Sequence, residues 1–211
     1  MNPISQNSQT PVGPVRTLEF FYEFASTYSY LSALRIESLA RARGIEVRWR
    51  PFLLGPIFKE QGWTDSPFNH FPVKGRYMWR DLERRAGRYG LAFRRPSQFP
   101  RNGLPAARIA LLGAGEGWAP EFSRRVYAAN FVEDLDIGRL EVLSPLLAGL
   151  GLEPAEVLKR AEAEANKAAL RAQTERAKSL GIFGAPSFVV GEELFWGDDR
   201  LEDALAWCER P

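Results

Sequence analysis

Strand-forming segments occur only towards the two ends of this 211-residue chain. Near the start, residues 17–22 are rich in aromatic side chains, and residues 45–51 alternate apolar and basic side chains up to a proline. Near the end, residues 186–190 and 194–196 flank a Gly-Glu-Glu turn, which is typical of a hairpin. The middle of the chain carries helical periodicity. A sheet in this protein therefore has to join segments that are far apart in the sequence.

The helical segments complete the order of elements. A helix over residues 28–43 ends at Gly44, and an amphipathic helix capped by Asp198 or Asp199 closes the chain. Between them we predict helices over residues 76–89, 105–112, 120–131, 137–150 and 154–180. The resulting order, β-α-β, then helices, then β-β-α, resembles an α/β thioredoxin-like fold with a large all-helical insertion. We expect a disordered tail (1–14), a discontinuous thioredoxin-like domain (15–55 and 181–211) and a helical insertion domain (56–180).

Composition excludes several classes of site. Twenty-eight basic and 26 acidic side chains leave a net charge of +2, which gives no argument for binding to nucleic acid or membrane. The single cysteine, Cys208, cannot form an intramolecular disulfide, and the single histidine, His70, excludes a multi-histidine metal site. We expect no bound metal. There is no apolar run of about 20 residues and no signal-peptide pattern, so the expected location is the cytoplasm.

Ser26 stands where the first helix begins. The free N–H groups and the dipole of a helix start favour an anion. A redox protein of this fold has a reactive cysteine there, whereas this chain reads Ser26-Thr27-Tyr28-Ser29. Serine cannot form a disulfide, which excludes a dithiol oxidoreductase, but its hydroxyl can donate a hydrogen bond to a thiolate supplied by another molecule. The alternative is an ordinary helix N-cap.

Two further motifs lie near the other end of the chain. Ala185-Pro186 precedes a strand, and in a thioredoxin fold this peptide bond is cis and turns the backbone of residue 185 towards a ligand; the alternative is a proline that merely begins a strand. Asp198-Asp199-Arg200 can bind the ammonium and the carboxylate of an amino acid, the ammonium against Asp199. The alternative for one of these acids is a helix cap.

Together these motifs resemble the 2-hydroxychromene-2-carboxylate isomerase family, to which kappa-class glutathione transferases are related. The resemblance runs from about Arg16 to the C-terminus. It is carried by residues 20–31 (FFYEFASTYSYL), 50–59 (RPFLLGPIFK), 74–78 (KGRYM), 181–186 (GIFGAP) and 196–200 (WGDDR).

The resemblance implies glutathione as cofactor and a homodimeric assembly. It implies that Ser26, with Thr27 and Tyr28 beside it, binds the glutathione sulfur. It implies that Ala185, with Pro186, pairs with the cysteinyl backbone. Asp198, Asp199 and Arg200 are then expected at the γ-glutamyl end. This sequence has Trp63 where kappa enzymes have an asparagine, and Thr27 where the family frequently has proline.

A co-substrate would need its own contacts. Nine basic and two acidic residues lie between Lys74 and Arg101, but the aromatic residues among them have helical spacing, unlike a nucleic-acid platform. Most of these charges fit a solvated helix face. For an anionic substrate we prefer Arg101 and Asn102 in a loop, with Lys59 second and Trp63 as a further contact.

The expected reaction is a glutathione-dependent isomerisation of a small aromatic keto acid, interconverting 2-hydroxychromene-2-carboxylate and trans-o-hydroxybenzylidenepyruvate or a related catabolite. The resemblance implies that a glutathione thiolate adds to the conjugated keto acid and leaves again after rotation about the resulting single bond. Two alternatives stay open. One is a kappa-type transferase that releases a conjugate, and the other is a binding protein that has kept the fold without its chemistry.

Overall fold

The computed structural model describes residues 16–63 and 65–210, so the predicted tail over residues 1–14 lies outside the described residues. Four strands form one sheet in the order β2-β1-β3-β4. The strands are β1 (Arg16–Tyr22), β2 (Ile45–Pro51), β3 (Ser187–Val190) and β4 (Glu193–Trp196). Strand β2 is parallel to β1, whereas β3 is antiparallel to both β1 and β4. The predicted order of strands and helices is confirmed.

The pairing of β1 with β3 joins the two ends of the chain. Glu19 lies opposite Val189, Phe20 opposite Phe188 and Phe21 opposite Ser187. In an antiparallel pair the end of one strand lies beside the start of the other. The loop that follows β1 therefore lies beside the segment that leads into β3.

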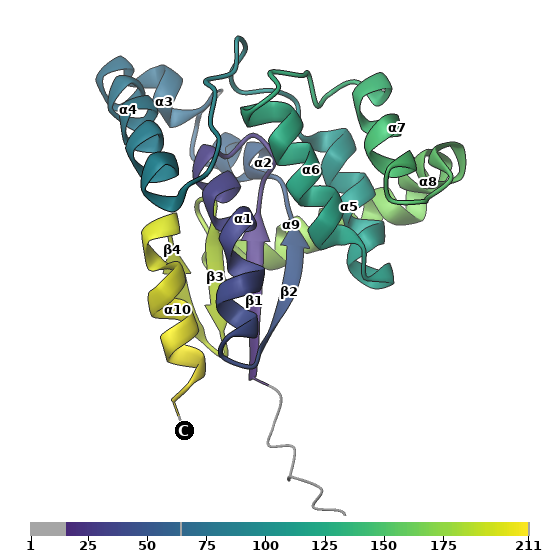
Figure 1. Cartoon of the computed structure of the whole chain (residues 1–211). Helices are drawn as coiled ribbons and strands as arrows, with labels where there is room; N and C mark the ends of the chain where they lie inside the picture. Colours follow the sequence, from purple (N-terminus) through teal and green to yellow (C-terminus); the bar gives the residue numbers. More distant parts are fainter. Residues whose placement is uncertain (1–15, 64, 211) are drawn as a thin grey trace, which may run out of the picture.

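One face of the sheet packs against α1 (Thr27–Arg41) and α10 (Leu201–Cys208) (Figure 1). Side chains alternate along a strand, so Phe20 and Tyr22 point to the same face, and both are fully buried. The Phe20 ring stacks on Phe188 at 5.5 Å and meets the edge of Trp49 at 5.0 Å, between ring centroids. These aromatic contacts tie three strands together on the α1 side.

The opposite face is covered by α2 (Leu54–Glu60) and α9 (Glu164–Ser179). Phe21 of β1 and Val189 of β3 pack there against a cluster that includes Ile57 and Ala177. Helix α9 falls within the residues predicted as the insertion, yet it contributes to the core beneath the sheet. The domain division at residues 56 and 180 stays a prediction.

Between α2 and α9 the chain is helical, as predicted. The elements are α3 (Pro67–His70), α4 (Pro72–Tyr89), α5 (Leu104–Glu116), α6 (Ala119–Phe131), α7 (Leu140–Ala148) and α8 (Pro154–Ala161). In Figure 1, α3 and α4 lie on one side of this region and α5 to α8 on the other. Helices α2 and α3 were not predicted, because both are short and contain proline.

Several helix boundaries differ from the prediction, and two of the differences have a clear structural basis. The single helix expected over residues 154–180 is wrong: α8 ends at Ala161, and α9 begins after Ala163, whose backbone is extended. Helix α5 does not end at residue 112, as predicted, but continues through Gly113 and Gly115 to Glu116. A Cβ at Gly113 would lie 2.5 Å from the Trp118 ring, so this glycine permits close packing of the next helix.

Replacing Phe20 by alanine tests how far the structure depends on the aromatic cluster. We expect Phe20→Ala to lower the free energy of unfolding by about 3–5 kcal/mol, because a fully buried ring leaves a cavity. Leu140→Ala is the control: this side chain is exposed, and its loss should cost less than about 1 kcal/mol. Urea denaturation measures both. If both variants lost the same free energy of unfolding, the stability of the fold would not depend on the Phe20 cluster.

Candidate active site

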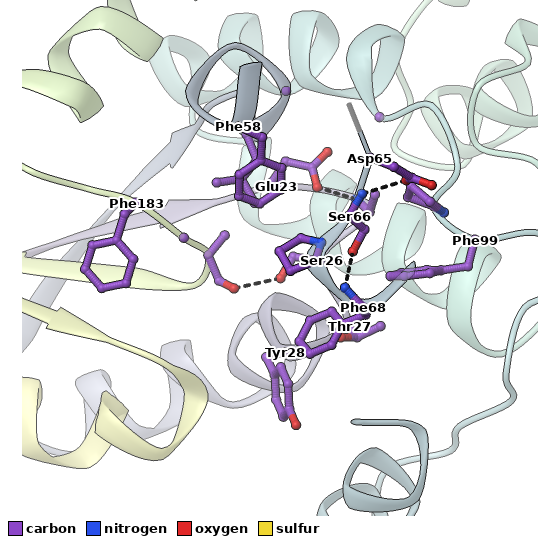
Figure 2. Close-up of a pocket in the computed structure, with 18 of the residues that line it drawn as sticks. Glu23, Ser26, Thr27, Tyr28, Phe58, Asp65, Ser66, Phe68, Phe99 and Phe183 are labelled. Carbon is purple, nitrogen blue, oxygen red and sulfur yellow. Dashed lines mark hydrogen bonds between the residues drawn. The ribbon is translucent and has the colours of Figure 1, made fainter. Parts of the chain in front are cut away.

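A cavity of about 1090 Å³ opens at the end of the sheet where β1 stops. Its walls come from the β1–α1 loop, α2 and the chain after it, α4, the loop before α5, the segment before β3 and the 3-10 turn η1 (Asp198–Arg200) (Figure 2). Pockets for one small molecule hold roughly 300–1,000 Å³. This cavity lies at the upper end of that range.

Ser26 and Ala185 meet at the wall of this cavity although 159 residues separate them. The Ser26 hydroxyl donates a hydrogen bond of 2.9 Å to the Ala185 carbonyl oxygen (Figure 2). Its oxygen also accepts the Ser29 N–H at 3.2 Å. Ser26 is thus the N-cap of α1. The Ala185–Pro186 bond is cis, as predicted. The Phe99–Pro100 bond is also cis, which was not predicted.

Pro186 does not line the cavity but joins two of its walls. Its carbonyl oxygen accepts the Gly197 N–H at 3.0 Å, which fixes the start of η1 beside the segment that contains Ala185. Gly197 has a φ of 108°, and a Cβ there would lie 2.5 Å from Asp199 Oδ1. A glycine is therefore required before the two aspartates.

Thr27 and Tyr28 line the cavity and attach α1 to α4. The Thr27 hydroxyl donates to the Met78 sulfur at 3.4 Å, and the Tyr28 hydroxyl donates to Asp81 at 2.9 Å. Burial and, next, the hydrogen bond to Asp81 raise the pKa of Tyr28 well above its ordinary value. Ser29, the second serine of the Ser-x-x-Ser sequence, is fully buried.

Asp198 has a different environment from the one expected. Its side chain has no exposed surface, and its carboxylate accepts hydrogen bonds from two arginines, a serine and a tyrosine. The donors are Ser32 at 2.8 Å, Arg35 at 3.2 Å, Arg85 at 2.6 Å and Tyr89 at 3.4 Å. The expectation that this carboxylate binds the γ-glutamyl end is corrected: it holds α1, α4 and η1 together.

Asp199 and Arg200 remain available to a ligand. Their side chains are each 54% exposed, and both line the cavity. They form a loose ion pair with an N–O distance of 3.6 Å, and Arg200 also contacts Asp203 at 3.0 Å. Recognition of an amino-acid end by Asp199 and Arg200 stays a prediction.

Of the two cations preferred for an anionic substrate, Arg101 lines the cavity with its charge already paired, and Lys59 does not line it. The Arg101 side chain is 3% exposed, and its guanidinium pairs with Asp134 and donates to the carbonyl oxygens of Asn130 and Leu135. The hydrogen bonds of its two terminal nitrogens stabilise the neighbouring loops. Lys59 lies on α2 and is not one of the residues that line the cavity.

Asn102 and Trp63 do line the cavity. The Asn102 side-chain oxygen accepts the Leu104 N–H at 3.0 Å at the entry to α5. Trp63 belongs to an aromatic lining that the sequence did not reveal as a set. This lining comprises Tyr28, Phe58, Trp63, Phe68, Tyr77, Phe99, Phe183 and Trp196.

Lys74 is a cation of the site that sequence reasoning missed. It lines the cavity with Arg85, Arg101 and Arg200, each of which pairs with an aspartate. Among the described residues Lys74 has no carboxylate partner, and its ammonium lies 4.7 Å from the centre of the Phe71 ring. The resemblance motif at residues 74–78 contained this lysine, but its helical spacing gave no sign that it faced a cavity.

Glu23 is the second residue that was missed. It follows β1 directly and lines the cavity three residues before Ser26. Burial raises its pKa from 4.5 to about 7, although the N–H groups of Ala25 and Ser26 oppose this rise. The signal in the sequence was an acid between an aromatic strand and Phe24, a position where a carboxylate is poorly solvated.

Comparison with known proteins agrees with this arrangement. A family model described as a DSBA-like thioredoxin domain matches residues 17–206. A 2-hydroxychromene-2-carboxylate isomerase from Sphingobium xenophagum is 29% identical over 89% of this chain and 95% of its own. Human glutathione S-transferase kappa 1 is also 29% identical, over 90% of each chain.

A solved structure of a 2-hydroxychromene-2-carboxylate isomerase superposes with a TM-score of 0.81 at 24% identity, covering 90% of this chain and 95% of its own. The chain belongs to the DSBA-like thioredoxin domain family. The α/β thioredoxin-like fold class and the resemblance to 2-hydroxychromene-2-carboxylate isomerases and kappa transferases are thereby confirmed.

Neither a membrane span nor a metal cluster is evident in the residues that the structure describes. None of their helices has the length and apolar character to cross a bilayer. They contain no group of three or more metal-ligating side chains.

The buried carboxylate of Asp198 gives a test of how the site is held together. Asp198→Asn leaves Arg85 without its countercharge and Arg35 with Glu202 alone, and we expect the free energy of unfolding to fall by about 3 kcal/mol. Asp199→Asn, next to it and exposed, should change it by no more than about 0.5 kcal/mol. Urea denaturation compares the two. If Asp198→Asn left the free energy of unfolding unchanged, the ion pairs with Arg35 and Arg85 would not be what holds α4 in place.

Proposed function

We propose that this protein is a glutathione-dependent isomerase of small aromatic keto acids, of the 2-hydroxychromene-2-carboxylate type. The observation that carries the proposal is the Ser26 hydroxyl at the start of α1, hydrogen-bonded to the Ala185 carbonyl at the wall of a large cavity. Similar proteins named 2-hydroxychromene-2-carboxylate isomerase and glutathione S-transferase kappa 1 support the substrate and the thiol.

A thiolate beside Ser26 would be stabilised by two groups. The start of α1 presents N–H groups and the positive end of the helix dipole. The Ser26 hydroxyl has one proton, which now points to Ala185. By turning that proton to sulfur, Ser26 releases the Ala185 carbonyl, which can then accept the N–H of the cysteinyl residue. One rotation would thus complete two contacts to glutathione.

The reaction requires no net change of the thiol. The thiolate adds to the conjugated double bond of the keto acid, a carbon–sulfur bond forms, and the electron pair of the double bond moves to the carbonyl oxygen as an enolate. Rotation follows about the new single bond. The enolate then collapses, the carbon–sulfur bond breaks, and the electron pair returns to sulfur. The site contributes orientation and charge stabilisation.

The remainder of the cavity suits the second substrate. Aromatic side chains such as Phe58, Phe68 and Phe99 line it, and they favour contact with a flat aromatic ring. Lys74 replaces Arg101 and Lys59 as the proposed partner of the substrate carboxylate. Asp199 and Arg200 are the proposed contacts of the γ-glutamyl end.

A kappa-type transferase is the second candidate, because the human relative of that name covers the chain as fully as the bacterial isomerase does. The two reactions need the same thiolate. They differ in whether glutathione is consumed, and its concentration after complete turnover distinguishes them. Location in the cytoplasm and assembly as a homodimer stay predictions.

Ser26→Ala tests the role of the hydroxyl. A lost hydrogen bond to a charged group costs about 1.5–3 kcal/mol, and a pKa unit is about 1.4 kcal/mol. We therefore expect the pKa of bound glutathione to rise by about one to two units. Activity at neutral pH should fall and partly recover at higher pH, where the thiol ionises without help. Ultraviolet titration of bound glutathione measures the thiolate directly.

Glutathione affinity gives the control for this variant. Calorimetry should show similar binding to wild type and Ser26→Ala, because other contacts hold the rest of the tripeptide. Absence of binding at millimolar glutathione in the wild type would refute the proposal. If glutathione bound but formed no thiolate at any accessible pH, the result would favour the alternative of a binding protein without catalytic activity.

A further inference from the structure

A thiol that becomes a thiolate in this cavity has to transfer its proton to another group. A free cysteine thiol has a pKa of about 8.5, so most of it is protonated at neutral pH. Ser26 cannot accept the proton, because an alcohol is a very weak base and its oxygen already accepts the Ser29 N–H. The single histidine of the chain, His70, is not one of the residues that line the cavity.

Most carboxylates that line the cavity already have partners. Asp198 pairs with Arg35 and Arg85, and Asp199 with Arg200. The other two accept hydrogen bonds, Asp81 from the Tyr28 hydroxyl and Asp65 from the Ser66 N–H and the Asn69 amide. Among the described residues that line the cavity, one carboxyl group has no side-chain partner and accepts a hydrogen bond only from the backbone.

That group belongs to Glu23. One oxygen of its carboxyl accepts the Ala25 N–H at 3.0 Å. The other lies against Gly103, where an added Cβ would be 2.7 Å away. No lysine or arginine of the described residues forms an ion pair with it. Figure 2 draws Glu23 and Ser26 among the lining residues of the cavity. Glu23 is thus a partly buried acid without a countercharge, in the same short loop as Ser26.

We propose that Glu23 is the general base and acid of this site, accepting the proton of the incoming glutathione thiol and returning it when the thiol leaves. The inference rests on the proposed function. In the first step the S–H bond breaks, an O–H bond forms on the Glu23 carboxylate, and the electron pair stays on sulfur. In the last step the same proton returns to sulfur, so no other reactant is needed.

The surroundings of Glu23 suit this exchange. Its pKa is raised to about 7, and a base with a pKa close to the working pH transfers protons efficiently in both directions. From α6, Tyr127 donates its hydroxyl to the Glu23 carbonyl oxygen at 3.0 Å. From the loop before α5, Arg101 directs its charge to Asp134. Neither of these two groups forms an ion pair with the Glu23 carboxylate that would lower its pKa to the ordinary value.

Glu23→Gln is the main test, because glutamine keeps the size of the side chain and an oxygen for the Ala25 N–H. We expect kcat at neutral pH to fall by about 100-fold or more, with little change in glutathione affinity by calorimetry. In wild type, kcat should fall as the pH drops through about 7, because Glu23 becomes protonated. In the variant this limb should move to higher pH, since the thiol then loses its proton to solvent.

Asp65→Asn is the matched control, because it removes another carboxylate from the same cavity wall. It should leave both kcat and the pH profile unchanged. Suppose that the wild type binds glutathione and turns over, and that Glu23→Gln has the same kcat and the same acid limb of the pH profile. This result would overturn the role of Glu23 but not the proposed function. Wild type that binds no glutathione would overturn the proposed function, and this inference with it.

Glu23→Ala gives a second test, rescue of kcat by a small carboxylate. No rescue is expected if the Glu23 side chain has only a structural role. Removal of the side chain leaves space for a small carboxylate, so added formate should restore part of the lost kcat. Glu23→Gln, which leaves no such space, should not respond. Formate without effect on Glu23→Ala, together with an unmoved acid limb in Glu23→Gln, would contradict a role in proton transfer.

Discussion

The antiparallel pairing of β1 with β3 is the constraint on which the site depends. It aligns Phe20 with Phe188 and so brings the loop after β1 to the segment before β3. The Ser26 hydroxyl and the Ala185 carbonyl then lie 2.9 Å apart. The backbone of Pro186 in turn binds Gly197, which sets the start of η1. Three segments of the cavity wall thus follow from one pair of strands, at the end of the sheet where ligands commonly bind in α/β folds.

The remaining walls come from the helical region, and they are held by polar contacts between its helices and α1. Asp198 joins Arg35 of α1 to Arg85 of α4, and Tyr28 of α1 donates to Asp81 of α4. The charged groups near the cavity therefore fall into two classes, those with and those without an ion-pair partner. Asp198 and Arg101 stabilise the fold, whereas Lys74 and Glu23 have no ion-pair partner in the part of the chain that the structure describes, and we propose that they act on the ligands.

The sequence predicted those parts of the fold that depend on local pattern. Strand alternation and helix periodicity located the sheet segments and most helices. The break between α8 and α9 could not be predicted, because neither Glu162 nor Ala163 is a helix-breaking residue, although the backbone at Ala163 is extended. At Gly113 the predicted helix end was wrong. This glycine lies inside α5, where the absence of a side chain leaves room for the Trp118 ring.

The same division holds for the site. Ser26 and Ala185 could be predicted, because a helix start and a proline before a strand are local signals. Arg101 and Lys74 could not be told apart, because the difference lies in their partners: Asp134 neutralises Arg101 across a loop, and no described acid neutralises Lys74. Glu23 was overlooked because its function depends on burial, which the sequence shows only through the apolar residues around it.

We propose that the Ser26 hydroxyl turns from a backbone carbonyl to a thiolate when glutathione binds. A crystal structure of the protein with glutathione tests this most directly. We expect the glutathione sulfur within hydrogen-bond distance of Ser26 Oγ and the cysteinyl N–H bonded to the Ala185 carbonyl oxygen. A structure in which glutathione is bound while Ser26 still donates to Ala185, with the sulfur elsewhere in the cavity, would contradict it.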